Sequence, residues 1–419
     1  MPLGKYVELQ RGNTYQGALL GRPGPVLLGL ASIARNGGFR ADNLKTYGGQ
    51  SDPRMLLEPG DIYVSLKDVT QSADLLGAVA RVPDNVAQGR LTQDTVKLVF
   101  KSAAVSRDYI YWVLRTPEYR EYCRAHATGT TNLGLPRDDF LAFPVPPPTV
   151  RRTSLATILQ TLDDKIELNR RMNETLEEMA RAIFKDWFVD FGPTRAKMEG
   201  RAPYLAPDIW SLFPDRLDDE EIPHGWSGRP IYEIADVIYG APFASALFNT
   251  TQMGTPLIRI RDLVNECPGV WTPENHPKGY KVKQGDIVVG MDGEFRAYLW
   301  GGAEAWLNQR VCVFKPKGGY SAAFVRNSII DPLAHVEATE IATTVIHLGK
   351  NDIDRFRVSV PTAEIVEAFN DLAQPLYDQI VENKSEARIL AATRDLLLPK
   401  LMSGEIRLKD AEKIVGEVV

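Results

Sequence analysis

Two stretches of the chain place apolar side chains in alternating steps of four and three residues, as the helices of a coiled coil do. The first seam consists of Leu155, Leu159, Leu162, Ile166, Asn169, Asn173, Leu176, Ala180, Ile183 and Trp187. The second consists of Phe369, Ala373, Leu376, Ile380, Asn383, Ala387, Leu390, Arg394, Leu397 and Leu401. A pattern sustained over this length predicts two long helices that pair along their seams.

The fifth position of each seam is an asparagine, Asn169 in the first and Asn383 in the second. A buried amide is penalised in every helix alignment except the one that pairs it, so we expect the two asparagines to fix the helix register. The alternative is that each lies solvated at the edge of its seam. Pro375 is expected to kink or delay the second helix and Pro399 to break it, leaving a helix over 376–398.

The sequence also contains an internal duplication. The matched segments are 59–64 with 284–289, 91–93 with 307–309, 132–134 with 347–349, 143–146 with 358–361, and 162–169 with 376–383. The shift between partners drifts from 225 through 216 and 215 to 214, as loop insertions would make it. A chain built as unit, helix, unit, helix is expected to have two-fold pseudosymmetry and a ligand with two related halves.

Short apolar runs and turn residues predict that both repeated units are compact α+β folds. Expected strands are 26–30, 61–66, 96–100 and 141–145 in the first unit, and 257–260, 286–290, 311–314 and 356–360 in the second. Residues 107–125 are expected to form one helix. The predicted organisation is a unit at 1–147, a helix at 148–191, a linker at 192–225, a unit at 226–361, a helix at 362–402 and a tail at 403–419.

Composition narrows the class of protein. The chain is 44% hydrophobic and 25% charged, which is ordinary for a globular protein. Three cysteines in no disulfide or metal pattern suit a reducing cytosol, so we expect a cytoplasmic location. No signal peptide or apolar run long enough to span a bilayer is found, and no membrane partner is expected. The net charge of −5 requires any DNA-binding basic groups to gather on one face.

The usual signatures of catalytic sites are missing from the sequence. It contains no phosphate-binding loop, no dinucleotide fingerprint, no His-Glu-x-x-His and no Asn/Asp-Pro-Pro-aromatic tetrapeptide of amino-methyltransferases. The five histidines share no metal-ligand spacing. We therefore expect no catalytic residue, metal site or cofactor in this chain. The nuclease-like Glu382-Asn383-Lys384 is expected to be a solvated helix face.

Several long motifs resemble one family. LDDKIELNRRMNETLEEMARAIFKDWFVDFGP, which begins at Leu162, looks like the central conserved region of the specificity subunits of type I restriction-modification systems. RAKMEGR at 195–201, LFP at 212–214 and IPHGW at 222–226 are similar to the linker of that family, and RDLLLPKLMSGEI at 394–406 resembles its C-terminal signature. The first unit lacks an equivalent of the Trp226 entry segment, and we expect it to be slightly trimmed at its start.

This resemblance implies two target recognition domains separated by two long antiparallel coiled-coil helices, an internal pseudo-two-fold repeat of α+β class. Each domain would read one half of a bipartite, gapped sequence in double-stranded DNA, and the helices would set the gap. The subunit itself would not be an enzyme. It would recruit two modification subunits that use S-adenosylmethionine and, in the full complex, restriction subunits that translocate and cut DNA with ATP and Mg²⁺.

Base recognition requires donors and acceptors on loops held by a rigid unit. Polar residues in and beside the matched loops are candidates for DNA contact: Arg35, Arg40, Lys45, Lys67, Thr130, Asn132, Arg259, Arg261, Asp292 and Arg296. Gln93 and Gln309 recur at matched positions, and for both we expect a buried structural role.

Four aromatic residues, Phe184, Trp187, Phe188 and Phe191, form a stripe at helical spacing. Packing in a core is the default explanation of such a stripe, and docking of a modification subunit is the second. Two other functions remain open for the whole chain. One is a coiled-coil adaptor that binds no DNA, and the other is a fused methyltransferase-nuclease, against which the missing cofactor motifs argue.

Overall fold

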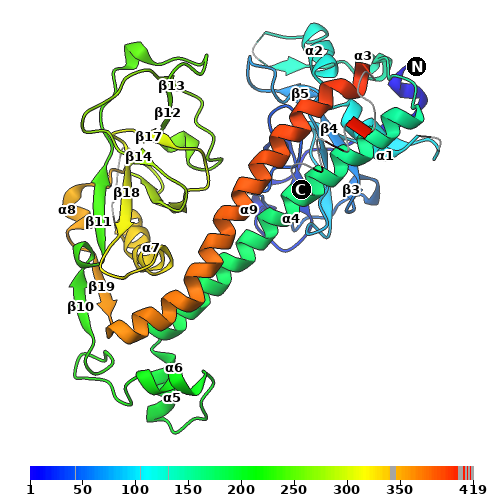
Figure 1. Cartoon of the computed structure of the whole chain (residues 1–419). Helices are drawn as coiled ribbons and strands as arrows, with labels where there is room; N and C mark the ends of the chain where they lie inside the picture. Colours follow the sequence, from blue (N-terminus) through cyan, green and yellow to red (C-terminus); the bar gives the residue numbers. More distant parts are fainter. Residues whose placement is uncertain are drawn as a thin grey trace. The chain divides into compact units, whose positions relative to one another are not determined.

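The computed structural model describes residues 1–42, 44–103, 105–130, 132–339 and 346–403, with 409, 410, 413 and 416. The chain forms two compact units. Unit 1 contains Met1–Lys165 and Ile389–Val419, and unit 2 contains Ile166–Arg388. Each unit therefore combines one repeated α+β part with a segment of both long helices, which are α4 and α9 in Figure 1.

The α+β part of unit 1 is built on a four-stranded antiparallel sheet in the order β1-β8-β4-β6. A three-stranded sheet, β2-β7-β3, packs with it, and in this sheet β2 and β7 are parallel. The strands are β1 (Val7–Arg11), β2 (Val26–Leu28), β3 (Leu56–Leu57), β4 (Ile62–Ser65), β5 (Lys67–Asp68), β6 (Val79–Arg81), β7 (Gly89–Leu91), β8 (Thr95–Phe100) and β9 (Leu133–Gly134). The apolar faces of both sheets meet around Leu28, Tyr63 and Leu91, which are fully buried.

Three short helices complete this part: α1 (Arg107–Val113), α2 (Pro117–Ala125) and α3 (Arg137–Ala142). The single helix expected over 107–125 is wrong, because Thr116 caps a new helix that begins at Pro117. The strand expected over 141–145 is also wrong. Leu141 and Ala142 end α3, and only Pro144 forms an isolated bridge, to Pro2.

Unit 2 repeats the plan with sheets in the orders β11-β18-β15-β16 and β13-β12-β17-β14, and with a short antiparallel pair, β10-β19. Its strands are β10 (Ser227–Pro230), β11 (Ala235–Tyr239), β12 (Thr255–Ile258), β13 (Trp271–Thr272), β14 (Lys281–Val282), β15 (Ile287–Gly290), β16 (Ala297–Leu299), β17 (Ala305–Leu307), β18 (Val311–Pro316) and β19 (Arg357–Val360). Its helices are α5 (Gly192–Met198), α6 (Pro207–Leu212), α7 (Ala322–Thr339) and α8 (Lys350–Ile353).

The strand registers contain the duplication expected from the sequence. Val64 faces Val96 in unit 1, and Val289 faces Cys312 in unit 2, so the shifts of 225 and 216 recur in the pairing. The match of 132–134 with 347–349, in contrast, is wrong by two residues. Lys67 pairs with Gly134, whereas Asp292 pairs with His347, which makes the structural shift 213.

The two long helices are α4 (Val150–Phe188) and α9 (Ala363–Ser403). The prolines do not shorten α9 to 376–398 as expected, because Pro375 and Pro399 both lie within the helix. Both prolines are exposed, and so are Asp371 and Asp395, whose carbonyls lose their helical donor and can bond to water instead. Every described seam side chain is buried or half-buried, and that of Leu401 lies outside the described residues.

The predicted linker at 192–225 is folded as part of unit 2. Its helices α5 and α6 place Phe213 against Trp187, with a ring-centroid distance of 5.1 Å, and Tyr204 against Trp210 at 5.6 Å. Within the described ranges no helix is both long and apolar enough to cross a membrane. The same residues contain no group of three His, Cys, Asp or Glu side chains arranged to hold a metal ion.

Candidate nucleic-acid interface

Three segments that are distant in the sequence meet beside Leu66, which follows β4. The Leu66 N–H donates to the carbonyl of Asp94 at 3.4 Å, and the Leu66 carbonyl accepts from the N–H of Leu135 at 2.9 Å. Lys67 pairs with Gly134 in the short β5-β9 ladder. We call this meeting point of 65–68, 92–95, 128–130 and 132–135 the unit 1 junction.

The side chains at the unit 1 junction surround a cavity of about 470 Å³. Lys67 Nζ lies 3.0 Å from Asp94 Oδ1, and the two side chains are 50% and 24% exposed. The cavity is lined by Leu30, Lys67, Asp68, Val69, Gln93, Asp94, Thr128, Gly129, Asn132, Leu133 and Gly134. A cation, two carboxylates and two amides thus line one open site.

Asp68 holds the loop that carries Lys67. Its buried carboxylate accepts from the N–H and hydroxyl of Thr70, both at 2.8 Å, and from the N–H of Leu75 at 2.7 Å. Because these bonds satisfy both carboxylate oxygens, Asp68 is a structural residue. The neighbouring Lys67 is left with its ammonium at the surface.

The same junction recurs in unit 2. The Met291 N–H donates to the carbonyl of Arg310 at 2.9 Å, and the Met291 carbonyl accepts from the N–H of Leu348 at 2.8 Å. The side chain of Asp292, the next residue, contacts two side chains. Its Oδ1 lies 2.7 Å from His347 Nδ1 and 3.5 Å from Arg310 Nη1.

The two junctions have matched backbones and inverted charges. Lys67 of unit 1 takes the place of Asp292 in unit 2, and Asp94 takes the place of Arg310. The cations are 50% and 57% exposed, and the acids 24% and 26%. Sequence reasoning singled out Lys67 and Asp292 but missed Asp94 and Arg310. The available signal was their position directly after the matched Gln93 and Gln309.

Gln93 and Gln309 themselves are exposed, so the expectation that both are buried is wrong. Each lies at the tip of a tight turn that points its side chain outward. The turn in unit 1 is closed by the Thr95 N–H on the Thr92 carbonyl at 3.3 Å, and that in unit 2 by Val311 on Asn308 at 2.9 Å. Both units therefore present the same amide next to opposite charges.

The remaining unit 1 candidates are exposed but spread more widely. Arg35, Arg40 and Lys45 lie on the segment between β2 and β3, and Arg40 Nε pairs with Asp42 at 3.2 Å. None of the three lines the cavity of the junction. Asn132 lines it, whereas the exposed Thr130 does not.

In unit 2 the remaining candidates differ in role. Arg259 is committed to Asp262, a buried residue, through Nε at 3.1 Å and Nη2 at 3.4 Å, and this pair caps a short 3-10 helix. Arg259 is therefore held as a structural residue. Arg261 is exposed, and Arg296 is exposed with Glu294 as its partner at 2.6 Å.

Asn169 and Asn383 are buried, with 1% and 5% exposure, rather than solvated at the seam edge. Asn169 Nδ2 donates to the Asn383 carbonyl at 3.4 Å and to Glu386 Oε2 at 2.5 Å. Asn383 Nδ2 donates to Asn173 Oδ1 at 2.8 Å. The two predicted asparagines thus belong to one polar cluster in the helix pair, and Asn173 is its third amide.

The aromatic stripe lies in the core of unit 2. Phe184, Trp187 and Phe188 are at most 8% exposed, and all three rings pack against Phe369 of α9 at centroid distances of 5.2 to 6.1 Å. Phe191 is half-buried against Trp226. This burial corrects the docking hypothesis for the first three rings, because they have almost no surface left for a partner.

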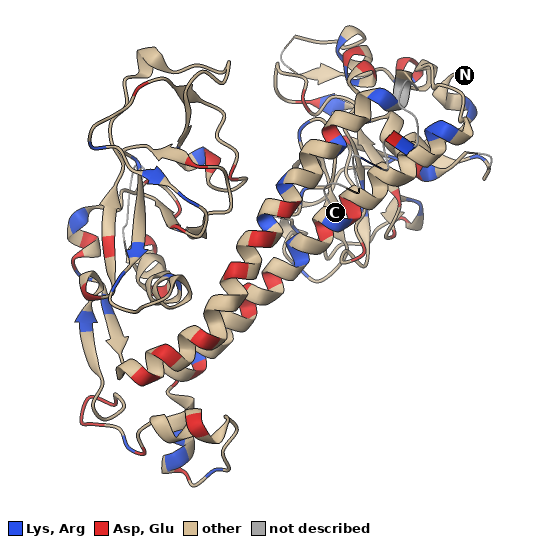
Figure 2. Ribbon diagram, viewed as in Figure 1, with Lys and Arg blue, Asp and Glu red and all other residues tan. Residues whose placement is uncertain are grey.

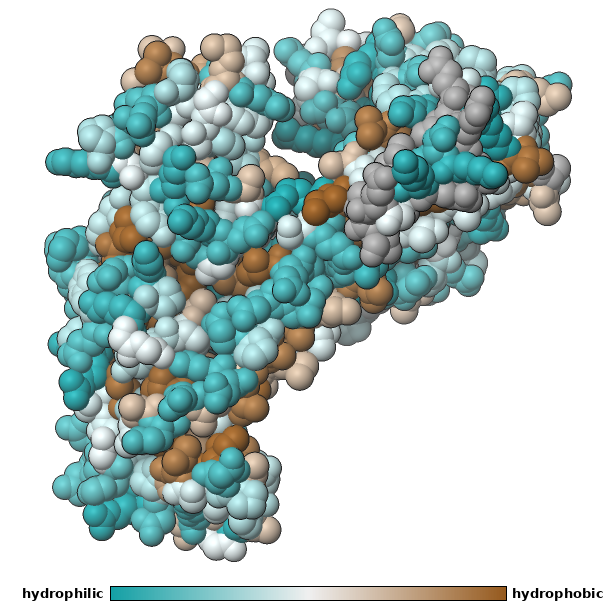
Figure 3. Space-filling model, in the orientation of Figure 1, coloured by the Kyte–Doolittle hydropathy of each residue, from teal (hydrophilic) through white to brown (hydrophobic). Residues whose placement is uncertain are grey.

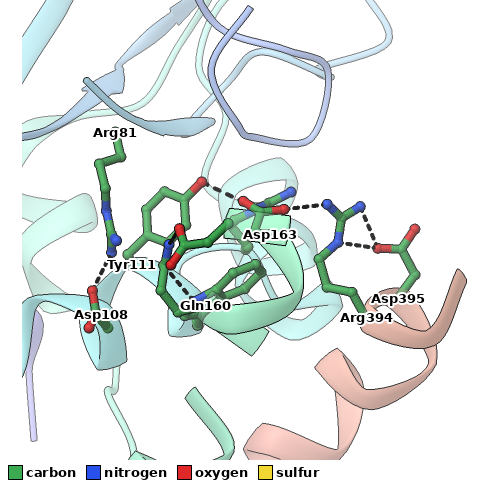
Figure 4. A network of polar contacts seen from close by, with 10 residues as sticks. Arg81, Asp108, Tyr111, Gln160, Asp163, Arg394 and Asp395 are labelled. Atoms are coloured by element: carbon green, nitrogen blue, oxygen red, sulfur yellow. Dashed lines mark hydrogen bonds and ion pairs between the residues drawn. The ribbon is translucent and has the colours of Figure 1, made fainter. Parts of the chain in front are cut away.

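Each α+β part is fastened to the helices of its own unit through an arginine whose side chain is mostly buried. In unit 1, Arg115 Nη1 lies 3.3 Å from Asp163 of α4 and donates to Tyr111 Oη at 3.2 Å. Figure 4 labels Tyr111 and Asp163. In unit 2, Arg326 of α7 pairs with Glu177 of α4 at 2.9 Å and donates to Tyr377 Oη of α9 at 3.1 Å. These contacts limit how far each junction can move relative to the helices of its own unit.

Charge and hydropathy are unevenly distributed. Acidic residues recur along α4 and α9 (Figure 2). The sequence of α9 contains seven acidic and four basic residues, whereas that of α4 contains seven of each. On the face drawn in Figure 3, hydrophilic residues predominate and hydrophobic ones form smaller patches. Among the described residues of α4 and α9, the exposed large apolar side chains are Val150, Leu168, Met172, Met179, Leu372, Ile389 and Leu396.

Comparisons with known proteins point to one class. The chain is 27% identical over 354 residues to the type I restriction enzyme MjaIX specificity subunit of Methanocaldococcus jannaschii, which covers 80% of this chain and 75% of the relative. It is 24% identical over 302 residues to the HindI specificity subunit of Haemophilus influenzae, covering 59% and 66% of the two chains. No protein-family model matches the chain.

A solved structure has a similar fold. The S subunit of a type I restriction-modification system from M. genitalium aligns over 96% of this chain and 95% of its own length, with a TM-score of 0.54 and 14% sequence identity. The similarity includes both α+β parts and both long helices, because it extends over nearly all of both chains. Over most of its length, this chain is therefore similar in sequence to type I restriction enzyme specificity subunits.

Proposed function

We propose that this chain is the DNA sequence-recognition subunit of a type I restriction-modification complex. Its relatives are specificity subunits, and it carries the same junction of three loops twice, once in each unit. Two copies of one scaffold with different side chains suit a target made of two different half-sequences. The duplicated junction is the observation that carries the proposal.

The division of labour follows from the arrangement of residues within each unit. The α+β parts, at 1–147 and 226–361, would each contact one half of the target. The paired helices would hold them at a fixed separation, because their buried seams allow little adjustment in register. Longer helices would therefore mean a longer gap between the half-sites.

Catalysis is assigned to other subunits. Two modification subunits would bind this chain and transfer a methyl group from S-adenosylmethionine, and restriction subunits would use ATP and Mg²⁺. In this proposal the chain supplies recognition and assembly alone. Exposed apolar residues on the outer sides of α4 and α9, such as Met172 and Leu372, are more accessible docking candidates than the buried aromatic stripe.

The proposal is tested by producing the chain together with modification subunits of its own system and sequencing the methylated adenines in the DNA of the producing cell. A bipartite sequence with a fixed gap supports it. Exchange of residues 226–361 for the same part of a relative should then change one half-sequence only. Assembly with no sequence preference would favour the adaptor, and methyl transfer by the chain alone would favour the fused enzyme.

A further inference from the structure

The inverted charges of the two junctions suggest what each one recognises. We propose that Lys67 with Asp94, and Arg310 with Asp292, each read one G·C base pair in the major groove, and that the pair is read in opposite orientations by the two units. The inference rests on the proposed function and assigns its specificity to four side chains. It concerns one base pair of each half-site.

Stability does not explain these ion pairs. Each joins a cation that is at least half exposed to an acid about one quarter exposed. Ion pairs this open contribute little to folding, because water screens them. A purely structural role would also not explain why the two units keep the same backbone positions and exposures for this ion pair but exchange its charges. A surface role explains both features.

The chemistry of a base pair matches that of the side-chain pair. In the major groove, guanine presents N7 and O6 as acceptors, and cytosine presents its N4 amino group as a donor. O6 and N4 are adjacent, because they hydrogen-bond to each other within the base pair. A cation beside a carboxylate therefore matches a guanine beside a cytosine. In unit 1, Lys67 would donate to guanine and Asp94 would accept from cytosine.

Inverting the charges inverts the preferred base pair. In unit 2 the acceptor Asp292 stands where unit 1 has Lys67, and the donor Arg310 stands where unit 1 has Asp94. With an equivalent approach of each unit to its half-site, the guanine would lie on the other strand. Both ion pairs still have hydrogen-bonding positions left for the bases. A carboxylate has about four acceptor positions and a lysine has three donors, so one ion pair does not use them all.

The third position of the junction differs between the two units. His347 contacts Asp292 in unit 2, whereas unit 1 has Gly134 at that place. A Cβ on Gly134 would meet Thr128 Oγ1 at 3.5 Å, which is an ordinary contact, so unit 1 can accept a side chain there. The junction of unit 2 can therefore be grafted onto unit 1.

The experiment uses the complex of the full chain with its modification subunits, and its readout is the sequence around each methylated adenine. Lys67→Asp with Asp94→Arg, alone or with Gly134→His, is expected to replace one G·C by C·G in one half-site. The other half-site and the gap should stay unchanged. Asp292→Lys with Arg310→Asp should do the same in the other half-site.

A matched control inverts another exposed ion pair of unit 1. Lys101 and Glu8 lie 3.6 Å apart, and Lys101 directly follows the end of β8, whereas Asp94 directly precedes its start. Glu8→Lys with Lys101→Glu leaves the net charge unchanged, as the junction variant without Gly134→His does. This control is expected to recognise the original sequence at the original rate.

Each result decides between the proposals. If the inverted junction methylates the original sequence at the original rate, or if a position other than G·C changes, the inference is overturned. If it methylates nothing, the neutral variant Lys67→Gln with Asp94→Asn decides. Relaxed choice at one base pair and a rate about 10- to 100-fold lower support the inference, and unchanged choice refutes it. A wild-type complex without sequence preference would instead refute the proposed function.

Discussion

Asp163 of α4 forms an ion pair with Arg394 of α9 at 2.6 Å within unit 1 (Figure 4), and the same carboxylate lies 3.3 Å from Arg115. One carboxylate thereby connects both helices with the α+β part. Burial by itself would lower the pKa of Arg394, but Asp163 and Asp395 raise it above its ordinary value. The guanidinium stays charged because its partners compensate for the water it has lost.

Asp163→Asn is expected to lower the free energy of unfolding by about 2–3 kcal/mol, because it leaves two mostly buried guanidinium groups without their shared anion. Urea unfolding followed by circular dichroism measures this. Asp395, which is 64% exposed and also pairs with Arg394, provides the control, and Asp395→Asn should cost less than about 1 kcal/mol. Equal effects of the two substitutions would contradict the anchoring role.

The asparagine cluster predicts coupled effects. Asn383→Ala should lower the free energy of unfolding by about 1–3 kcal/mol, since it leaves the buried Asn173 amide without its donor. Asn169→Ala is expected to have an effect of similar size. In the double variant the two losses should not add, with an interaction energy of about 0.5 kcal/mol or more. Strict additivity would show that the asparagines act separately.

The helices are expected to set the gap of the DNA target. Inserting seven residues after Lys165 in α4 and seven after Arg388 in α9 keeps the seam in phase to within about 20°. It lengthens the pair by about 10 Å, which corresponds to about three base pairs at ~3.4 Å each. Methylated-adenine sequencing should find both half-sequences unchanged and a longer gap. A changed half-sequence, or an unchanged gap in an assembled complex, would contradict the spacer role.

The exposed glutamines are expected to contact DNA in both half-sites. Glutamine can bond adenine through N6 and N7, and a good contact of this kind contributes about 1–3 kcal/mol. Gln93→Ala should therefore weaken binding of the complex to its target by about 5- to 100-fold. Gln309→Ala should weaken it by a similar factor. Fluorescence anisotropy with target and scrambled duplexes measures this. An equal loss on both duplexes would indicate a sequence-independent contact.

The burial of Cys312 predicts that the free energy of unfolding falls at alkaline pH. Complete burial raises the pKa of its thiol from 9.0 to about 12. Between these values the unfolded chain releases a proton that the folded chain keeps, so a rising pH favours unfolding. The contribution is intact below pH 9 and about 1 kcal/mol is lost by pH 10. Urea unfolding at pH 8 and pH 10 should show a smaller decrease for Cys312→Ala than for the wild type, and equal decreases would contradict the assignment.

The sequence alone determined the features that depend on periodicity and repetition. The seams from Leu155 and Phe369 predicted both long helices, because a helix repeats its core-facing positions at a fixed interval. The matched segments predicted two units of one topology, since similar strands and turns build similar sheets. The two prolines misled the prediction for α9, because packing of residues such as Tyr377 outweighs the local cost of a proline on an exposed face.

Only the tertiary structure decided which polar residues share a site. Lys67, Asp94 and Gly134 are separated along the chain and meet through backbone bonds to their neighbours, which no local pattern encodes. The strand pairing alone showed that Asp292 faces His347 where Lys67 faces Gly134, because that alignment lies two residues away from the match in the sequence. Loops contribute little to periodicity, so their alignment is decided by the strands that hold them.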